Sequence, residues 1–541
     1  MVSSSSSSKK KKVCVVGAGV SGLASARELL REGHDVTAME QSGGVGGQWL
    51  YDPATDAGDP LGTAGVHSSV YASVRLISPR QVTGFSDFPF YPKNDGGGDA
   101  RRYPGHGEFL RYIRNFCDAF GLMDAVRLNT KVLHVGMAPP AGDGVMSRWV
   151  VRSSRRHGRE GEGEEVLTEE VFDAVVVAVG QYTQPRLPAI TGMDTWRRRQ
   201  LHSHSYRVPD SFHGEVVVVV GCHESGKDIA LELRTVARDV HVSVKSMDDV
   251  HPGMLKAIEC LCEDGQVVFA GGCSVVADAV IYCTGFNLSF PFLDTAGLVA
   301  VDDNRVGPLF EHTFPPALAP SLSFVGLPRK VPVPLFYETQ ARWVAQVLSG
   351  RRSLPPEEEM LRSVEEHRRA MEAAGVPKRL SHDILDWEEY CGGAGELGFP
   401  RLELDEWKRE LLKSSFARLL DSTESFRDSF HDSELVREGL REQGWPNRLQ
   451  RWRKELLCAA VERLQHDTEG FRDDYHDSDI VVEGLRSEGW LPRTENDGHG
   501  EEGDGVPAAE PLHHPQPQTG LHVICLFRAR DRTRSDYILA D

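Results

Sequence analysis

The feature that most constrains the fold is the sequence Gly17-Ala18-Gly19-Val20-Ser21-Gly22, which directly follows the apolar run at residues 13–16. A helical pattern of apolar residues comes next, so the order predicts a strand, a tight turn and a helix. In such a unit Gly17 permits the turn and Gly19 lets the backbone approach a pyrophosphate. Gly22 lets the helix pack on the strand, with the helix N-terminus aimed at the phosphates. This stretch therefore predicts a dinucleotide site.

The residues after this helix strengthen the prediction. A second predicted strand, residues 35–39, ends at Glu40, whose carboxylate can accept both hydroxyls of a ribose. Another glycine-rich stretch, residues 43–49, then ends on Gln48 and Trp49. Its backbone and the Gln48 amide could approach a flat polar ligand, and a plain flexible loop is the alternative.

A second unit of the same kind begins near the middle of the chain. Five valines at residues 216–220 predict a strand buried on both faces, followed by Gly221-Cys222-His223-Glu224-Ser225-Gly226 and a helix over 227–236. The next predicted strand, residues 240–244, ends near Lys245. A basic residue in place of an acid suggests a 2′-phosphate, and hence NADPH, although a solvated surface lysine is the alternative. Two nucleotide sites imply electron transfer between two cofactors.

Length, charge and cysteine content limit the class of protein. The chain has 541 residues, enough for two or three domains, and its formal net charge of -19 disfavours nucleic acid and anionic membranes as partners. No apolar run is long enough for a membrane anchor, and we expect residues 1–12 to form a disordered tail. The ten cysteines include no CxxC pair, which favours reduced thiols, a cytoplasmic location and no metal site. A flavin disulfide reductase would need such a redox pair.

The chain repeats itself near its C-terminus at a spacing of 45 residues, as from Trp407 to Trp452. Each copy predicts an amphipathic helix, an acidic turn and a second helix that ends at Gly-Trp. These helices could cover a core surface or mediate self-association, so a homo-oligomer is possible. We expect residues 493–541 to be mostly disordered, because they are polar and rich in proline and glycine.

Several motifs resemble those of plant flavin-containing monooxygenases, in particular the S-oxygenating branch named for glucosinolate oxidation. The resemblance covers about residues 13–400 and includes the loop at 43–49 and the sequence Tyr282-Cys283-Thr284-Gly285-Phe286. The family's identifying pattern, FxGxxxHxxx(Y/F), falls on four residues of which only the last two match: Trp196, Arg198, His202 and Tyr206.

The resemblance implies an α/β fold of two Rossmann-like dinucleotide-binding domains, a large FAD-binding domain with a smaller NADPH-binding domain inserted, plus the helical C-terminal duplication. The expected boundaries are 13–205 and 286–400 for the FAD-binding domain, 206–285 for the NADPH-binding domain, and 401–492 for the duplication. The residues implied for FAD are Gly17, Gly19, Gly22, Glu40, Gln48, Trp49, His67 and Ser68. Those implied for NADP are Gly221, Ser225, Gly226, Lys245, His202 and Tyr206.

The activity implied is a monooxygenase cycle in which NADPH reduces FAD and dioxygen adds at the flavin C4a position. The resulting hydroperoxide then oxygenates a soft nucleophile, most simply a thioether sulfur of a small plant metabolite. N-hydroxylation, or the oxidative decarboxylation of the auxin-forming relatives, is the alternative within this class. The chain needs no catalytic acid–base pair for this chemistry, because the cofactor supplies it.

Two departures from the family pattern bear on activity. The wider family often carries an active-site Asn in a Thr-Asn pair, and Leu76 and Ile77 stand there in this chain. His223 occupies the centre of the second glycine loop, where a side chain could crowd a pyrophosphate. A catalytically impaired nucleotide-binding homologue is therefore the rival interpretation, and no catalytic side chain is assigned.

Overall fold

The computed structural model describes most of the chain up to Trp445, and every described residue belongs to the first of two compact units, which ends at Pro446. The described ranges are 10–54, 58–63, 68–92, 98–139, 148–157, 164–182, 184–245, 254–384, 386–396, 398–421 and 425–445. His67, the second copy of the repeat, residues 1–9 of the predicted N-terminal tail and the predicted tail at 493–541 lie outside them. The N-terminal tail predicted over residues 1–12 was too long, because Lys12 begins a β-strand and pairs with Asp35.

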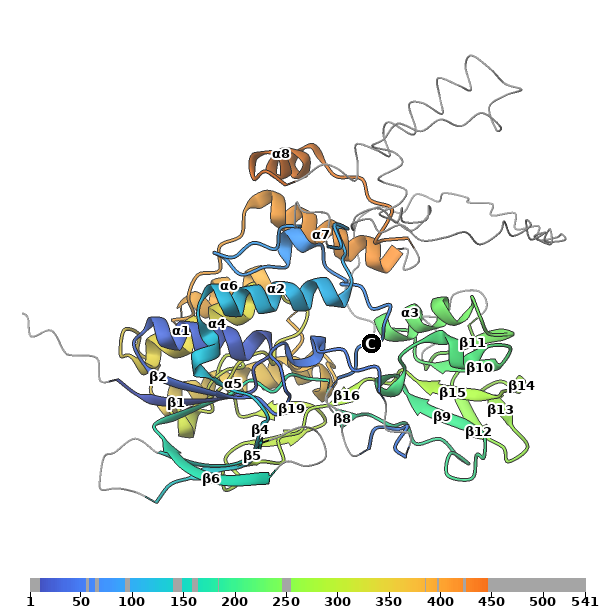
Figure 1. Cartoon of the computed structure of the whole chain (residues 1–541), viewed down its shortest axis with the longest axis horizontal. Coiled ribbons are helices and arrows are strands. Elements are labelled where there is room, and N and C mark those ends of the chain that lie inside the picture. The colour runs from blue at the N-terminus through green and yellow to red at the C-terminus, as the bar shows by residue number, and fades with distance from the viewer. Residues whose placement is uncertain are drawn as a thin grey trace, which may run out of the picture. The chain divides into compact units, whose positions relative to one another are not determined.

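The first glycine loop leads out of a parallel five-stranded sheet with the strand order β20-β7-β1-β2-β3. Its members are β1 (Lys12–Val16) and β2 (Asp35–Met39) (Figure 1), with β3 (Val126–Arg127), β7 (Ala174–Val177) and β20 (Leu322–Phe324). Strand β1 pairs with β2 on one side and β7 on the other, which explains its almost uninterrupted apolar sequence. Helix α1 (Val20–Arg31) crosses from β1 to β2.

The second glycine loop leads out of a separate parallel sheet with the order β11-β10-β15-β9. Its members are β9 (Arg199–His202), β10 (Val216–Val220), β11 (Asp239–Ser243) and β15 (Ala279–Tyr282), with helix α3 (Glu224–Leu233) between β10 and β11 (Figure 1). Strand β9 pairs with β15, so this sheet takes in residues upstream of 206, where the sequence placed the domain boundary. The antiparallel strands β12 (Ile258–Leu261), β13 (Gln266–Phe269) and β14 (Ser274–Val276) form a sheet of their own.

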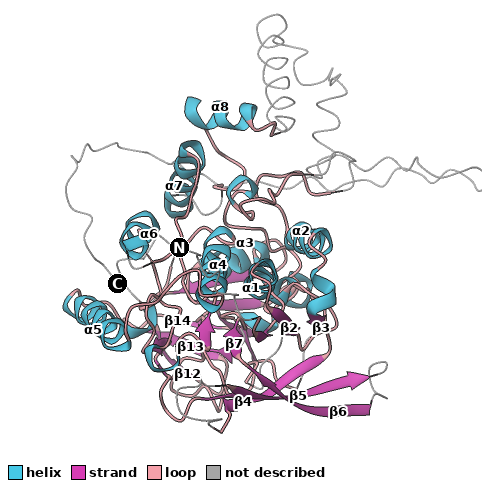
Figure 2. Cartoon of the chain, turned by 90° about the vertical axis from the view of Figure 1, so that its left-hand side faces the viewer, coloured by secondary structure: helices cyan, strands magenta, loops and turns pink. Residues whose placement is uncertain are grey.

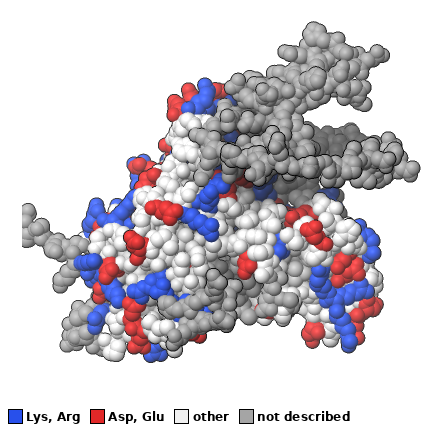
Figure 3. All heavy atoms as spheres, viewed as in Figure 1, with Lys and Arg blue, Asp and Glu red and all other residues white. Residues whose placement is uncertain are grey.

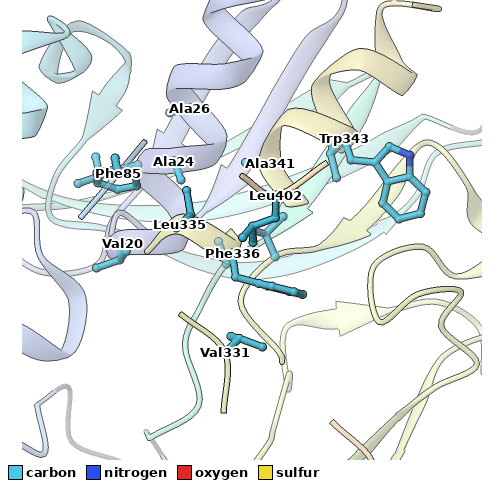
Figure 4. Packing of buried hydrophobic residues seen from close by; sticks show 14 of the residues in the cluster. Val20, Ala24, Ala26, Phe85, Val331, Leu335, Phe336, Ala341, Trp343 and Leu402 are labelled. Carbon is cyan, nitrogen blue, oxygen red and sulfur yellow. The ribbon is translucent and has the colours of Figure 1, made fainter. Parts of the chain in front are cut away.

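Small residues let two helices approach closely beside the first sheet. Helix α4 (Leu335–Leu348) packs on α1, and the side chains of Ala24, Ala26 and Ala341 lie in one core with Leu335 and Phe336 (Figure 4). Ala24 and Ala26 are fully buried. Helix α2 (His106–Ala119) contributes aromatic residues to the same core. The glycine loop at the start of α1 is thus attached to a rigid scaffold.

The remaining described elements form smaller layers. An antiparallel meander of β4 (Thr130–Met137), β5 (Trp149–His157) and β6 (Glu164–Phe172) can be followed in Figure 2, and β17 (Leu293–Asp294) joins it at its edge. Trp149 and Phe172 are fully buried in the core beside it. Two short strand pairs follow: β8 (Gln184–Pro185) with β16 (Phe286–Asn287), and β18 (Ala300–Asp302) with β19 (Arg305–Gly307). Helices α5 (Glu357–Ala373) and α6 (Trp387–Glu396) come after them in the chain.

The first copy of the C-terminal repeat is part of this unit. It forms α7 (Glu406–Asp421) and α8 (Glu434–Glu442) with a turn between them, which confirms the predicted helix–turn–helix for this copy. Gly439 lies against the ring of Trp407, since a Cβ there would be 2.2 Å from the ring. The apolar residues of this copy share the core of α1 and α2: Trp407, Leu411, Leu412, Val436, Leu440 and Trp445.

Charged side chains of both signs lie on the described surface, and they are intermixed on the face drawn in Figure 3. Among the described residues, no helix combines the length and apolar character needed to cross a bilayer. The eight described cysteines are free thiols.

Candidate nucleotide-binding sites

The two glycine loops are built in the same way at their first glycine. Gly17 and Gly221 both have a φ of +101°, which side chains rarely adopt. The N–H of Gly17 donates to the Met39 carbonyl, and that of Gly221 donates to the Ser243 carbonyl, each over 2.8 Å. Each loop is thereby tied to the strand that follows its helix. A Cβ on either glycine would press into a neighbouring backbone carbonyl at 2.6 or 2.5 Å.

The last glycine of each loop serves the packing of helix on strand. A Cβ on Gly22 would lie 2.0 Å from the carbonyl oxygen of Gly17, and one on Gly226 would lie 2.1 Å from that of Gly221. Neither position has room for a side chain. The first and last glycines are therefore required by the fold itself, before any ligand is considered.

The middle glycine of the first loop behaves differently. Gly19 is the N-cap of α1, with φ −78° and ψ −169°, and no side chain caps the helix. A Cβ on Gly19 would touch only Gly47, at 3.5 Å from its Cα. The protein alone therefore does not require glycine here. The N–H groups of the first turn, which no side chain caps, fit the phosphates of a dinucleotide.

The acid predicted to hold a ribose lies at the end of β2 and is buried. One oxygen of Glu40 accepts the Ala18 N–H over 2.8 Å, and the other accepts the N–H and hydroxyl of Ser42. Since a carboxylate has about four acceptor positions, capacity remains for ribose hydroxyls. Glu40 thus links the first glycine loop to the strand end.

The second glycine-rich stretch lies against the first loop. The Gly46 N–H donates to the Ala18 carbonyl over 3.0 Å. A short 3₁₀ helix, η1 (Gly47–Trp49), follows, and the Trp49 ring meets Phe109 of α2 edge-on at 4.9 Å. The buried Ser68 hydroxyl donates to the Gln48 carbonyl over 3.1 Å. The residues predicted to hold FAD, except His67, therefore gather around the N-terminus of α1.

In the second nucleotide unit, His223 occupies the position that Gly19 has in the first. It is the N-cap of α3 with φ −84° and ψ −170°, almost the same backbone conformation, and its side chain is exposed. Strand register also locates Lys245: Val220 pairs with Ser243 as Val16 pairs with Met39, so the buried Val244 corresponds to Glu40. Lys245, one residue further, is exposed.

Both residues of the identifying pattern that match the family are buried and bonded within the protein. The Nδ1 of His202 accepts the His204 N–H over 3.1 Å, and its Nε2–H donates to the Gly285 carbonyl over 3.0 Å. Burial, helped by His204, lowers the pKa of His202 to about 4, so its ring is neutral. The Tyr206 hydroxyl donates to Glu232 of α3 over 2.8 Å, and burial raises its pKa. In this arrangement both side chains position β9 and α3.

Position 77 carries no polar side chain. Ile77 is 37% exposed, whereas Leu76 beside it is buried. The neighbouring Ser78 hydroxyl shares a hydrogen bond with Thr83 over 2.7 Å.

Sequence reasoning missed a buried arginine beside the loops that follow the first glycine motif. Arg207 donates to the carbonyls of Asp52, Ser68 and His204 over 2.6, 3.0 and 2.7 Å. Burial lowers its pKa. It therefore joins the stretch after β9 to the loops that follow η1. Its position directly after Tyr206 was a weak signal, because an arginine in a loop is usually solvated.

Comparison with known proteins gives one family and a consistent set of relatives. Residues 10–252 and 253–392 match the family described as flavin-binding monooxygenase-like. The flavin-containing monooxygenases FMO GS-OX-like 8 and 9 of Arabidopsis thaliana are 51% and 50% identical, covering 80% and 81% of this chain and 94% and 96% of their own. The structure of an S-allyl-L-cysteine S-oxygenase from Allium sativum matches with a TM-score of 0.72 and 42% identity, over 81% of this chain and 99% of that one.

Proposed function

This chain belongs to the flavin-binding monooxygenase-like family, and we propose that it uses FAD, NADPH and dioxygen to oxygenate a thioether sulfur in a small metabolite. The observation that carries the proposal is the pair of glycine loops on two separate parallel sheets. One loop is followed by a buried glutamate, and the other is followed by an exposed lysine. That difference supports FAD at the first loop and NADPH at the second.

The residues at the two nucleotide sites have distinct roles in this proposal. The N-terminus of α1 and the backbone at Gly19 bind the FAD pyrophosphate, and Glu40 binds its ribose. The N-terminus of α3 binds the NADPH pyrophosphate, and Lys245 pairs with the 2′-phosphate. FAD and NADPH, when bound, supply the reducing equivalents and the activation of dioxygen. The protein orients the two nucleotides and keeps water out.

The preference for sulfur rests on the relatives. The Allium sativum protein is named as an S-oxygenase of S-allyl-L-cysteine, which is a thioether. The Arabidopsis relatives carry the GS-OX-like name, and the match spans nearly their whole length. A thioether sulfur is a soft nucleophile that accepts an oxygen atom without help from a protein base. A chain without an assigned acid–base pair suits that substrate class.

The test is direct. The purified full-length chain should be yellow, release FAD on denaturation, and convert a thioether such as S-allyl-L-cysteine into its sulfoxide with NADPH. Incorporation of one ¹⁸O atom into the product under ¹⁸O₂, detected by mass spectrometry, identifies oxygenation. A parallel reaction with primary and tertiary amines tests N-oxygenation. A colourless protein, or a yellow one that oxidises NADPH without oxygenating either class, would refute the proposal.

A further inference from the structure

The turn between α7 and α8 reaches two other parts of the protein at once. Phe426 in this turn is buried and meets Tyr103 edge-on at 5.5 Å. The next residue, Arg427, donates from Nε to the Leu76 carbonyl over 3.1 Å and from Nη2 to the Arg75 carbonyl over 3.4 Å. Arg427 therefore holds the backbone directly before Ile77.

The same guanidinium binds helix α3 of the second nucleotide unit. Nη1 and Nη2 of Arg427 donate to Oδ1 and Oδ2 of Asp228 over 2.8 and 2.7 Å. The side chains of Arg427 and Asp228 are only 12% and 15% exposed. A two-point pair with this little exposure restricts both distance and angle more than a single contact does.

Asp228 receives a further contact from Tyr71, which belongs to the part of the chain assigned to the first nucleotide unit. The Tyr71 hydroxyl donates to its Oδ2 over 3.3 Å, and the Tyr71 ring meets Tyr206 edge-on at 5.6 Å. Tyr206 in turn donates to Glu232, one helical turn after Asp228. Helix α3 is therefore held at two successive turns of the same face.

We infer that Arg427 is a positioning residue which, through Asp228, fixes α3 on the segment that contains Ile77 and so sets the nicotinamide of NADPH against the flavin. This inference rests on the proposed function. Helix α3 begins at the second glycine loop, so a shift of the helix moves the nucleotide bound at its N-terminus. A misplacement of about 1 Å at a reacting centre can lower a rate about a hundredfold without weakening binding.

Neighbouring ion pairs also attach the C-terminal segment to the rest of the protein. Asp428 accepts two hydrogen bonds from Arg75, both over 2.9 Å. Asp432 accepts two from Arg102, over 2.6 and 2.7 Å, and the Arg102 guanidinium lies over the Phe430 ring at 3.9 Å. Neither pair involves α3. They provide matched controls from the same turn.

The experiment compares Asp228→Asn, Arg427→Met and Arg427→Lys with the controls Asp428→Asn and Asp432→Asn, all in the full chain loaded with FAD. Stopped-flow spectroscopy without oxygen gives the rate of flavin reduction at saturating NADPH, and calorimetry gives the dissociation constant of NADP⁺. Hydrogen–deuterium exchange reports the protection of residues 224–233 and 71–78 independently of turnover.

For Asp228→Asn and Arg427→Met we expect reduction to slow by roughly ten- to a hundredfold, with the NADP⁺ dissociation constant changed less than about threefold. Exchange should rise in 224–233. Arg427→Lys keeps the positive charge but cannot make the two-point contact of a guanidinium with Asp228. Its rate of flavin reduction should therefore lie between that of these variants and that of wild type. In both control variants NADPH should reduce the flavin at the wild-type rate. Asp432→Asn should lower only the thermal stability of the protein.

Wild-type reduction rates with unchanged exchange in Asp228→Asn would overturn the inference, and so would equal slowing in Asp428→Asn. If the wild-type flavin is not reduced by NADPH, the proposed function fails instead. In that case the exchange measurement still decides whether Arg427 and Asp228 hold α3.

Discussion

Gly19 and Gly47 meet backbone to backbone, since a Cβ on Gly47 would lie 3.0 Å from the Cα of Gly19. The loop after β1 and the loop after β2 therefore close on each other with no side chain between them. This contact places the start of α1 and the η1 segment beside the same site. Gly17 and Gly22 are required by the fold, because a Cβ on either would clash with backbone. Gly19 has room for a Cβ, so its requirement comes from a ligand.

Gly19→Val should remove FAD without unfolding the chain. The Cβ of the new side chain fits at 3.5 Å from the Cα of Gly47. By the proposed function the pyrophosphate approaches the backbone at this residue, and a branched side chain would block that approach. We expect flavin content below about a tenth of wild type, measured as the ratio of flavin to protein absorbance. Gly107→Ala is the control, because nothing lies within 4 Å of a Cβ there. Wild-type flavin content in Gly19→Val would refute the FAD assignment.

Lys245→Ala should reduce the preference for NADPH over NADH. A charge contact with the 2′-phosphate contributes about 1 to 3 kcal/mol, so the ratio of flavin reduction rates at low nucleotide concentration should fall roughly ten- to a hundredfold. Lys131→Ala on β4 removes the same charge from another exposed lysine and should change nothing. An unchanged ratio in Lys245→Ala places the phosphate contact elsewhere.

Deletion of residues 446–541 should leave flavin binding intact. Every described core residue lies at or before Trp445, and the first compact unit ends at Pro446. Truncation after residue 400 should instead give insoluble protein, because it removes seven core side chains: Leu402, Trp407, Leu411, Leu412, Val436, Leu440 and Trp445. Soluble protein that has lost its flavin after the shorter deletion would contradict this prediction.

Ile77→Asn should lower the release of hydrogen peroxide per NADPH consumed. An oxygen without a hydrogen-bond partner in a buried site costs about 1 to 3 kcal/mol, which corresponds to roughly one to two powers of ten in rate. An amide at this position supplies a donor that Ile77 lacks, and the adjacent Ser78 hydroxyl is already bonded to Thr83. Peroxide and sulfoxide are measured in the same reaction. Ile77→Val is the control, and equal coupling in all three proteins would eliminate a role for position 77.

His202 should make the protein less stable in acid. Its folded-state pKa, about 4, lies below the ordinary value of 6.5, so the unfolded chain takes up a proton first as the pH falls. Its contribution is complete above pH 6.5 and is lost between there and about pH 4. In His202→Asn, the amide oxygen still accepts the His204 N–H, but the group does not titrate. The stability difference between wild type and this variant, from urea unfolding at fixed FAD, should narrow by about 2 kcal/mol from pH 7 to pH 5. Parallel pH profiles would contradict this.

The sequence by itself determined the two nucleotide units. Strand, glycine turn, helix and second strand are local features, encoded within about thirty residues by apolar periodicity and by glycines whose backbone angles no other residue adopts easily. The strands β1, β2, β10 and β11 accordingly lie within one residue of the predicted ranges. The motifs that carried the family resemblance are equally local.

Only the tertiary structure decided which groups meet. The middle glycine differs from its neighbours because Gly47 lies opposite it, His202 is neutral because β9 pairs into the second sheet, and Arg427 reaches Asp228 across 199 residues. Contacts between residues so far apart in sequence leave no periodic signal. Their energies depend on burial, which exists only once the chain has folded.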